Sequence, residues 1–154
     1  MKKTLLTLLS IWFCCSISLA QGRTIEVKAS QGSANKNLEQ ALQQAASLKG
    51  TPVTIKFEPG IYNLKRTDAI QKLYYVSNTT SEQEDADPTK HIGLLLASLK
   101  NVTIDGAGST LLMDGEMTSF AVDGCENITL KNFCIDHKRI TCKSVWFRHI
   151  FLSA

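Results

Sequence analysis

The chain has 154 residues, of which 44% are hydrophobic and 20% are charged. That composition fits one globular domain and argues against intrinsic disorder. The formal net charge is +3, and without the two lysines at the start of the chain 15 basic side chains face 14 acidic ones, a net charge of +1. So small an excess gives nucleic-acid binding no electrostatic support, and we expect no nucleic-acid partner.

Residues 1–20 have the features of a secretory signal peptide. Lys2 and Lys3 precede an apolar run over 5–17, and a cleavage signal of small residues ends at Ala20. The run is shorter than the roughly 20 apolar residues that span a bilayer, and no later stretch comes closer. We therefore predict a protein that is exported to the periplasm or the extracellular space, with no membrane association once the signal is removed.

The part of the mature chain that we assign to the fold, 21–139, opens with a short strand and a helix. Apolar and polar residues alternate over 24–29, which predicts the strand. An apolar stripe with steps of three and four residues predicts a helix over 37–49, with Asn35 or Asn37 as its N-terminal cap. Because one apolar stripe needs a surface to cover, we expect this helix to cap the first coil of a repeat structure.

The first coil and a long excursion follow the helix. Alternating residues over 53–57 predict a strand, and Glu58-Pro59-Gly60 turns the chain before a second strand over 61–64. Between 65 and 91 the alternation lapses. Connections of this length are uncommon and tend to be functional.

A motif in the second half of the chain occurs twice, 26 residues apart. Asn101-Val102-Thr103-Ile104-Asp105 returns as Asn127-Ile128-Thr129-Leu130-Lys131, with the same alternation of apolar and polar residues. A fixed period in this range indicates stacked coils, in which equivalent residues lie about 4.8 Å apart in neighbouring layers. The expected fold class is therefore all-β, a parallel β-helix with an N-terminal capping helix. Its corners are predicted at Asp105-Gly106, Asp114-Gly115 and Asp123-Gly124.

The last residues depart from this pattern. Residues 140–154 contain no Gly, Pro, Asn or Asp, so the corners of a further coil have no residues to form them. At the same period, Leu96 and Val122 would be followed by the charged Arg148. We expect an incomplete β-helix whose tail lies outside the fold, as after a frameshift or an early stop in a longer gene. An edge strand is the alternative. If the tail lies outside the fold, its apolar side chains would be exposed to solvent: Trp146, Phe147, Ile150 and Phe151.

Two groups of motifs resemble a known family. The stretches 53–62 and 101–108 are similar to the opening of pectin-lyase-like, single-stranded, right-handed parallel β-helices. The segments 73–80, 92–112 and 132–137 resemble exported bacterial alpha-1,3-galactosidases. This resemblance implies a glycoside hydrolase that removes terminal alpha-1,3-linked galactose from glycans, including the blood group B antigen, with a carbohydrate partner and no cofactor.

The resemblance supplies no catalytic or substrate-binding residue. It covers roughly 21–139, whereas the catalytic aspartates of the family lie on later coils and match no segment here. Glycoside hydrolysis needs two carboxyl groups on either side of one bond, about 6.5 to 9.5 Å apart in an inverting enzyme. We therefore expect this chain alone to be inactive. A calcium-dependent polysaccharide lyase and a non-catalytic glycan-binding β-helix are the alternatives.

Several polar and aromatic residues are candidates for chemistry, and each also has a structural interpretation. Carboxylates before Gly favour turns, and adjacent strand residues such as Asp136 and His137 point to opposite faces. The acidic cluster could bind calcium, but it lacks ligand spacing, and neither it nor the histidines predict a metal site. Tyrosines could stack on sugar rings or pack in the core. The candidates are Asp105, Asp114, Asp123 and Asp136; Glu82, Glu84, Asp85 and Asp87; His91, His137 and His149; and Tyr62, Tyr74 and Tyr75.

Outside the predicted signal peptide the sequence also contains three of its five cysteines and three glycosylation sequons. Cys125 falls where the other repeat has Leu99, so we expect it to be buried and inert, and a disulfide with Cys134 or Cys142 is the alternative. The sequons begin at Asn78, Asn101 and Asn127. We discount all three, because the signal peptide looks bacterial and the last two lie in expected strands.

Overall fold

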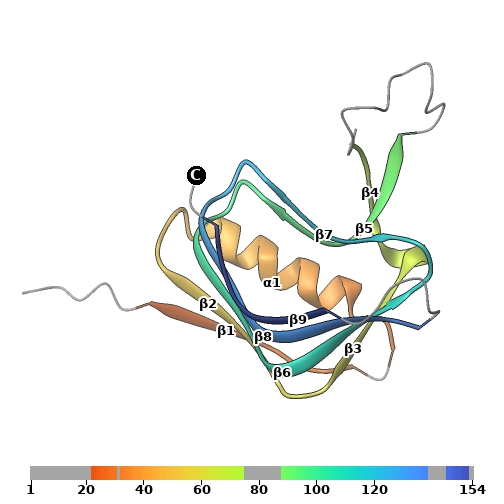
Figure 1. Ribbon diagram of the computed structural model, residues 1–154. Coiled ribbons are helices and arrows are strands. Elements are labelled where there is room, and N and C mark those ends of the chain that lie inside the picture. Colours follow the sequence, from red (N-terminus) through yellow and green to blue (C-terminus); the bar gives the residue numbers. More distant parts are fainter. Residues whose placement is uncertain (1–21, 31, 75–87, 139–144, 153–154) are drawn as a thin grey trace, which may run out of the picture.

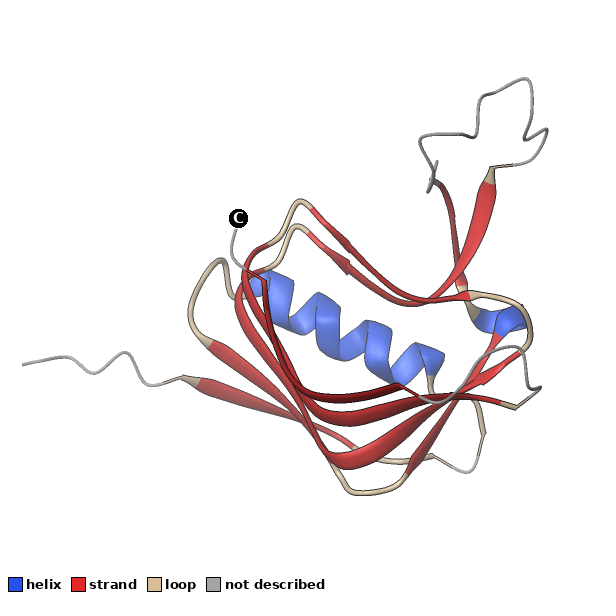
Figure 2. Ribbon diagram, in the orientation of Figure 1, coloured by secondary structure: helices blue, strands red, loops and turns tan. Residues whose placement is uncertain are grey.

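The computed structural model describes residues 22–30, 32–74 and 88–138, and the backbone of 145–152. The fold is mostly β-strand with one long helix, as Figure 2 shows, and the all-β class is confirmed. None of the described helices is long and apolar enough to cross a membrane. The elements are β1 (Arg23–Val27), α1 (Asn35–Ser47), β2 (Val53–Phe57), β3 (Ile61–Lys65), the short 3-10 helix η1 (Arg66–Asp68), β4 (Ile70–Leu73), β5 (Thr89–Ala97), β6 (Lys100–Asp114), β7 (Thr118–Asp123), β8 (Glu126–His137) and β9 (Val145–Leu152).

The strands form two sheets with α1 lying across the space between them (Figure 1). The first sheet has the order β1-β2-β6-β8-β9, and β3 also pairs with the long strand β6. The second has the order β4-β5-β7. Pairing is parallel except between β4 and β5 and between β8 and β9. Neither sheet closes on itself.

The 26-residue repeat predicted from the sequence is present as parallel register. Val102 pairs with Ile128 and Ile104 with Leu130 between β6 and β8, and Leu94 pairs with Phe120 between β5 and β7. All four of the β6 and β8 side chains are buried. The equivalent positions of β2, Val53 and Ile55, pair with Val102 and Ile104 from the other side and are buried as well. Apolar residues therefore stack on apolar residues through three successive strands.

Helix α1 starts two residues earlier than expected and is not capped as expected. Its N-cap is Ala34, which forms no side-chain capping bond, so the prediction that Asn35 or Asn37 caps the helix is wrong. The buried Asn35 instead accepts a hydrogen bond from Lys65 N (2.9 Å) and donates one to Lys65 O (3.3 Å). An amide side chain can pair in this way because it carries the same donor and acceptor as a peptide group. The start of α1 is thus tied to the end of β3.

The apolar stripe of α1 is buried in the common core. The helix packs against β1, β2, β3 and β5, and its stripe belongs to the same hydrophobic cluster as the inward residues of both sheets. Burying aliphatic side chains stabilises the fold by about 1.5 to 3 kcal/mol for each large residue. The buried residues of the stripe are Leu38, Ala41, Leu42 and Ala45.

Two asparagines of the repeat form a ladder at one corner. Asn101 and Asn127 have φ of 56° and 54°, a left-handed conformation that asparagine tolerates better than most residues. Asn127 Nδ2 donates to Asn101 Oδ1 at 2.6 Å, and Asn101 Nδ2 donates to Gly50 O at 2.8 Å. The same residue type therefore makes both the bend and the link between layers. These side-chain amides have structural partners, and the discounting of both sequons stays a prediction.

The bend of β6 after Asp105 is formed differently from the prediction. Positive φ falls on Ala107 (48°) and Gly108 (84°), not on Gly106. Gly106 is needed for close approach, because a Cβ built there would lie 2.4 Å from Phe133 Cβ and 2.7 Å from Asn132 O. The carboxylate Oδ1 of Asp105 accepts a hydrogen bond from Ala107 N at 3.0 Å, which is the local bond expected of Asp in a turn.

The tail forms an edge strand, which was the alternative interpretation. β9 pairs antiparallel with β8, with Ile128 opposite Leu152 and Ile135 opposite Val145. Our expectation that 140–154 lies outside the fold is therefore corrected for 145–152, while 139–144 fall outside the described residues. The last strand of a sheet presents unpaired backbone groups that any extended segment can pair. An antiparallel partner needs none of the corner residues that a further parallel coil requires.

We expect Asn101→Ala to lower the free energy of unfolding by about 1 to 3 kcal/mol, because it removes two hydrogen bonds and because alanine tolerates the left-handed conformation less well than asparagine does. Asn101→Gly removes the same bonds but keeps the conformation accessible, so it should lose less. Urea denaturation of the full chain measures both. Equal losses in the two variants would show that the backbone conformation contributes nothing.

We expect Gly106→Ala to destabilise the chain by about 1 to 3 kcal/mol, because the new methyl group overlaps Phe133 and the Asn132 backbone. Gly32→Ala is the matched control, since a Cβ at Gly32 meets no atom within 4 Å. Thermal unfolding followed by circular dichroism separates the two. A Gly106→Ala protein as stable as the control would contradict the close packing of this bend.

Candidate functional site

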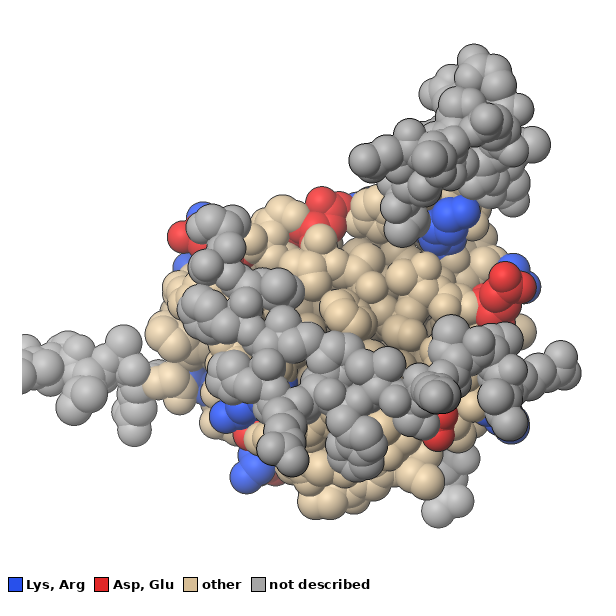
Figure 3. Space-filling view, in the orientation of Figure 1, with Lys and Arg blue, Asp and Glu red and all other residues tan. Residues whose placement is uncertain are grey.

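A polar hollow at the base of the β4–β5 hairpin is the strongest candidate for a functional site. It has a volume of about 370 Å³. In the view of Figure 3, charged side chains lie around the margin of the molecule, including the region where the hairpin leaves it. The hollow is lined by one residue of η1, three from the start of β5 and three from the approach to β7: Arg66, Thr89, Lys90, His91, Glu116, Met117 and Thr118.

The predicted Asp114-Gly115 corner positions this hollow. Gly115 has φ of 113°, and a Cβ built on it would lie 2.8 Å from Arg66 Cβ. Only glycine therefore allows the side chain of Arg66 to pack on the corner that leads to Glu116. The parallel pairing of Ile92 with Thr118 fixes the opposite side, because it sets the start of β5 beside the start of β7.

The hollow contains polar groups without protein partners. Within the described part of the chain, the exposed side chains of Arg66 and Glu116 form no ion pair and no hydrogen bond, although they carry opposite charges. His91 Nδ1 is buried and has no hydrogen-bond partner there. An unpaired buried polar atom is unfavourable by about 1 to 3 kcal/mol, and such atoms call for an explanation. Of the residues that line the hollow, Glu116 is the sole carboxylate.

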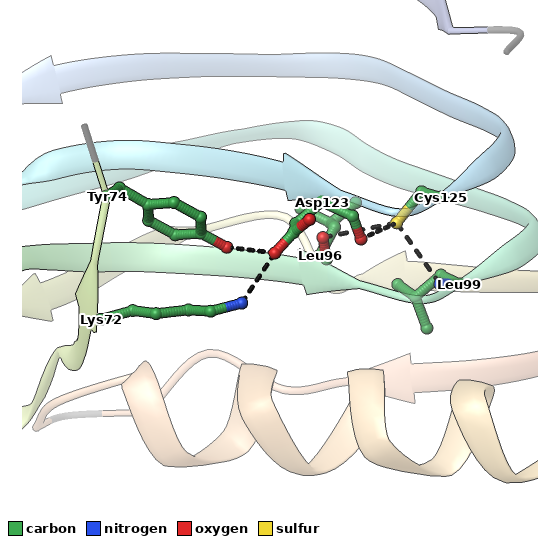
Figure 4. Close-up of polar contacts among 6 residues, drawn as sticks. All are labelled: Lys72, Tyr74, Leu96, Leu99, Asp123 and Cys125. Carbon is green, nitrogen blue, oxygen red and sulfur yellow. Dashed lines mark hydrogen bonds and ion pairs between the residues drawn. The ribbon is translucent and has the colours of Figure 1, made fainter. Parts of the chain in front are cut away.

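A second polar cluster joins β4 and the residue after it to the end of β7 within the second sheet (Figure 4). Lys72 Nζ lies 2.7 Å from Asp123 Oδ2, the Tyr74 hydroxyl donates to the same oxygen at 2.6 Å, and Lys72 Nζ lies 4.8 Å from the centre of the Tyr74 ring. The hydrogen bonds from Lys72 and Tyr74 lower the pKa of Asp123, and the bond to Asp123 raises the pKa of Lys72. The side chains of Lys72 and Asp123 are 41% and 44% exposed, so solvent screens the pair.

The other candidate carboxylates have structural partners. Asp114 forms an ion pair with Lys138 at 3.0 Å, and Asp136 Oδ1 accepts a hydrogen bond from His137 N at 2.8 Å.

Asp105 has the largest set of partners among these carboxylates. It accepts hydrogen bonds from Ala107 N and from Asn132 Nδ2, both at 3.0 Å, and lies 3.3 Å from Lys131 Nζ. Burial raises the pKa of Asp105, but these hydrogen bonds and the charge of Lys131 outweigh it, so that the pKa lies below its usual value. The bond from Ala107 N agrees with the predicted turn role of Asp105, whereas the turn role of Asp114 stays a prediction, because its contact is the ion pair with Lys138. Asp123 has in addition the link to β4, which the sequence analysis did not find.

The tyrosines divide between the two interpretations. Tyr62 is fully buried, stacks obliquely on Phe57 and has its hydroxyl 2.7 Å from Val27 O and 2.9 Å from Glu58 O. Burial raises its pKa. Tyr62 is therefore a packing residue, whereas Tyr74 belongs to the cluster with Asp123. Tyr75 and Asn78 lie outside the described residues.

No metal centre is assembled in the described part of the chain, where no three His, Cys, Asp or Glu side chains come together. Glu82, Glu84, Asp85 and Asp87 lie outside it, so the expectation that this acidic cluster forms no metal site stays a prediction. His91 lines the hollow, and His137 follows Asp136 at the end of β8. The backbone of His149 pairs with Lys131.

Cys125 and Cys134 are free thiols. Cys134 is buried, and its pKa is raised by burial and by the nearby charge of Asp136. Cys125 is half-buried, not fully buried as expected: its Sγ accepts a hydrogen bond from Leu99 N and donates one to Leu96 O, both at 3.3 Å (Figure 4). The thiol thus links its layer to the preceding one. Cys142 lies outside the described residues.

Comparison with known proteins identifies the relatives of this chain. No protein-family model matches it. It is 60% identical over 134 residues, or 87% of its length, to alpha-1,3-galactosidase A of Bacteroides thetaiotaomicron. It is also 36% identical over 84% of its length to alpha-1,3-galactosidase B of the same organism, and 34% identical over 90% to alpha-1,3-galactosidase B of Bacteroides fragilis.

By sequence, the chain belongs to the alpha-1,3-galactosidase family. The resemblance drawn from the motifs is thereby confirmed. The chain spans about a quarter of the length of the curated relatives that it matches, 24%, 21% and 24% of the three named above. The match is therefore to one part of those galactosidases.

The residues that line the hollow, and those that link β4 to Asp123, could not be recognised from the sequence. Arg66, Glu116 and Lys72 are ordinary surface residues by type, and no spacing connects them. The one available signal was Gly115, whose place in a corner was predicted but whose contact with Arg66 depends on the tertiary fold.

We expect Asp123→Asn to loosen the start of the hairpin, because the amide keeps hydrogen bonding but loses the charge that attracts Lys72. Hydrogen exchange of the β4 amides should be faster than in the parent at pH 7. Glu26→Gln, which removes one exposed acidic charge from β1, is the control and should leave β4 exchange unchanged.

The pH dependence of this link has a definite sign. The pKa of Asp123 is lowered from its usual 3.8. The stability that the ionised Asp123 gives to the link is therefore fully present above pH 3.8 and is lost as the pH falls through the lowered pKa. The stability that the charged Lys72 gives to the link is present below its usual pKa of 10.5 and is lost as the pH rises through the raised pKa. In the parent, β4 amides should exchange faster once Asp123 is protonated at low pH, and Asp123→Asn should lack this change. A parent and variant with the same profile below pH 4 would contradict the link.

Proposed function

We propose that this chain forms the first coils of a right-handed parallel β-helix glycoside hydrolase that removes terminal alpha-1,3-linked galactose from glycans. The single observation that carries the proposal is the 60% identity to alpha-1,3-galactosidase A over 87% of the chain. We propose further that residues 1–20 direct export, which would bring the enzyme to extracellular or periplasmic glycans.

Parallel register between layers supports the β-helix part of the proposal. β5 pairs in parallel with β7 at an offset of 26 residues, and β6 pairs in parallel with β8 at an offset of 26 up to Asp105 and of 24 from Ser109. β1, β2 and β6 pair in parallel on the same sheet. Parallel strands in sequence order, joined by corners with left-handed residues, are what successive coils require. The helix α1 packs beside β1, β2 and β3, which is the end of the stack that a capping helix would cover.

The described carboxylates support a scaffold role for this part of the enzyme. Hydrolysis of a glycoside needs an acid and a second carboxylate on opposite sides of one bond. Asp105, Asp114 and Asp123 each bond to a lysine, and Asp136 bonds to the backbone of its own strand. We propose that the catalytic pair lies on later coils of the longer polypeptide, and that this chain alone releases no galactose.

A hybrid enzyme tests the proposal directly. Residues 22–138 of this chain replace the matching stretch of the Bacteroides thetaiotaomicron alpha-1,3-galactosidase A, and galactose release from an alpha-1,3-linked galactose disaccharide is measured. If the two stretches are equivalent coils, the hybrid should retain release within about tenfold of the parent enzyme, a difference of about 1.4 kcal/mol in transition-state stabilisation.

The controls are the unaltered relative, which should be active, and this chain by itself, which should not. A hybrid that folds cooperatively yet releases no galactose would overturn the proposed function. Release of galactose by this chain alone would overturn the placement of the catalytic pair on later coils.

A further inference from the structure

The hollow between η1, β5 and β7 has no role in the scaffold function proposed above. The corner at Gly115 and the pairing of β5 with β7 need neither the side chain of Glu116 nor the charged end of Arg66, both of which are exposed. Exposed charges of opposite sign that lie near one hollow commonly form an ion pair, but no such pair is found here within the described residues. These groups are therefore available to a ligand.

The size and chemistry of the hollow fit a polyhydroxyl compound. Its volume of about 370 Å³ lies within the range of about 300 to 1,000 Å³ that is usual for small-molecule sites. A sugar hydroxyl donates one hydrogen bond and accepts others, so it requires donors and acceptors together. Arg66 supplies donors, Glu116 supplies acceptors, and Thr118 supplies a hydroxyl that does both. Met117 adds an apolar, polarizable surface for the C–H groups of a sugar ring.

The charges select a neutral ligand. An anion would be attracted by Arg66 and Lys90 but would meet the carboxylate of Glu116, whereas a cation would meet the two basic residues. A neutral hexose avoids both repulsions and can still bond to each group. Among the described residues the lining contains one carboxylate, whereas glycoside hydrolysis needs two, so these groups fit binding without turnover.

We propose that this hollow is a non-catalytic binding site for a neutral hexose unit, formed by Arg66, His91, Glu116 and Thr118. The buried Nδ1 of His91 gains a partner when a sugar hydroxyl, or a water molecule that the sugar holds, enters the site. Such a site would hold a glycan chain on the first coils while its end is processed elsewhere. The site rests on its own geometry, and only the choice of galactose as the probe rests on the proposed function.

The test is titration of the full chain with methyl α-D-galactopyranoside, followed by amide chemical shifts in two-dimensional NMR. We expect saturable shifts at Glu116, Met117 and Thr118, and binding weakened about tenfold or more in Glu116→Gln, which loses a charged hydrogen-bond acceptor. Glu26→Gln makes the same charge change on β1 and should bind as the parent does. Thr118→Val, which removes a hydroxyl at nearly constant volume, is the second variant and should also weaken binding.

Three results would overturn the inference. One is the absence of saturable shifts with the galactoside and with the matching glucoside. Another is equal binding by Glu116→Gln, Thr118→Val and Glu26→Gln. The third is tighter binding of methyl β-D-glucuronide or of inorganic sulfate, which would make the site one for anions. None of these results affects galactose release by the hybrid enzyme, so failure here is distinguishable from failure of the proposed function.

Discussion

The structure depends on one constraint, the stacking of equivalent residues in neighbouring strands. Between β6 and β8 an offset of 26 places Val102 on Ile128 and Ile104 on Leu130, so that buried apolar side chains stack on each other. The outward positions keep the same offset, with Thr103 beside Thr129. A shift of one residue would turn each apolar side chain to the outside. Burial therefore fixes the register up to Asp105, and beyond the irregularity between Asp105 and Ser109 the offset is 24, with Leu111 on Ile135.

Polar residues reinforce this register where burial does not act. The Asn101–Asn127 bond and the Lys100–Glu126 ion pair, at 2.6 Å, both join residues 26 apart. The ion pair is exposed and contributes little, since exposed pairs are typically worth 0.2 to 1 kcal/mol. The asparagine bond contributes more to specificity, because both residues also hold a left-handed bend that few side chains tolerate. A shifted layer would lose the bond and misplace the bend together.

How much the sequence could predict depended on whether a feature is local. The repeat, its strands and the apolar stripe of α1 follow from periodicity, and all were predicted. The role of Asn35 was not, because its partner Lys65 is 30 residues away and the cap position looked equally suitable. Gly106 was assigned to a turn by its dipeptide, whereas its need arises from Phe133 on the next layer. The hollow could not be predicted for the same reason, since Arg66 and Glu116 line one hollow only after η1, β5 and β7 have packed together.

The two sheets differ at their last strands, and the difference bears on how this chain is stabilised. The outer edge of β8 is paired with β9, whereas in the described residues β7 is the outermost strand of its sheet. Its inward residues Phe120 and Val122 pair with the buried Leu94 and Leu96, yet Phe120 is half-buried and Val122 is 37% exposed. An inward residue on an outermost strand has a neighbouring layer on one side only, so it cannot reach the burial of the layer beneath. The relatives are about four times longer than the matched stretch, and a further strand on β7 is what the proposed β-helix would add. Strand β8 pairs in parallel with β6 at one edge and antiparallel with β9 at the other, so strand direction must be set by the connecting residues and not by the strand edge itself.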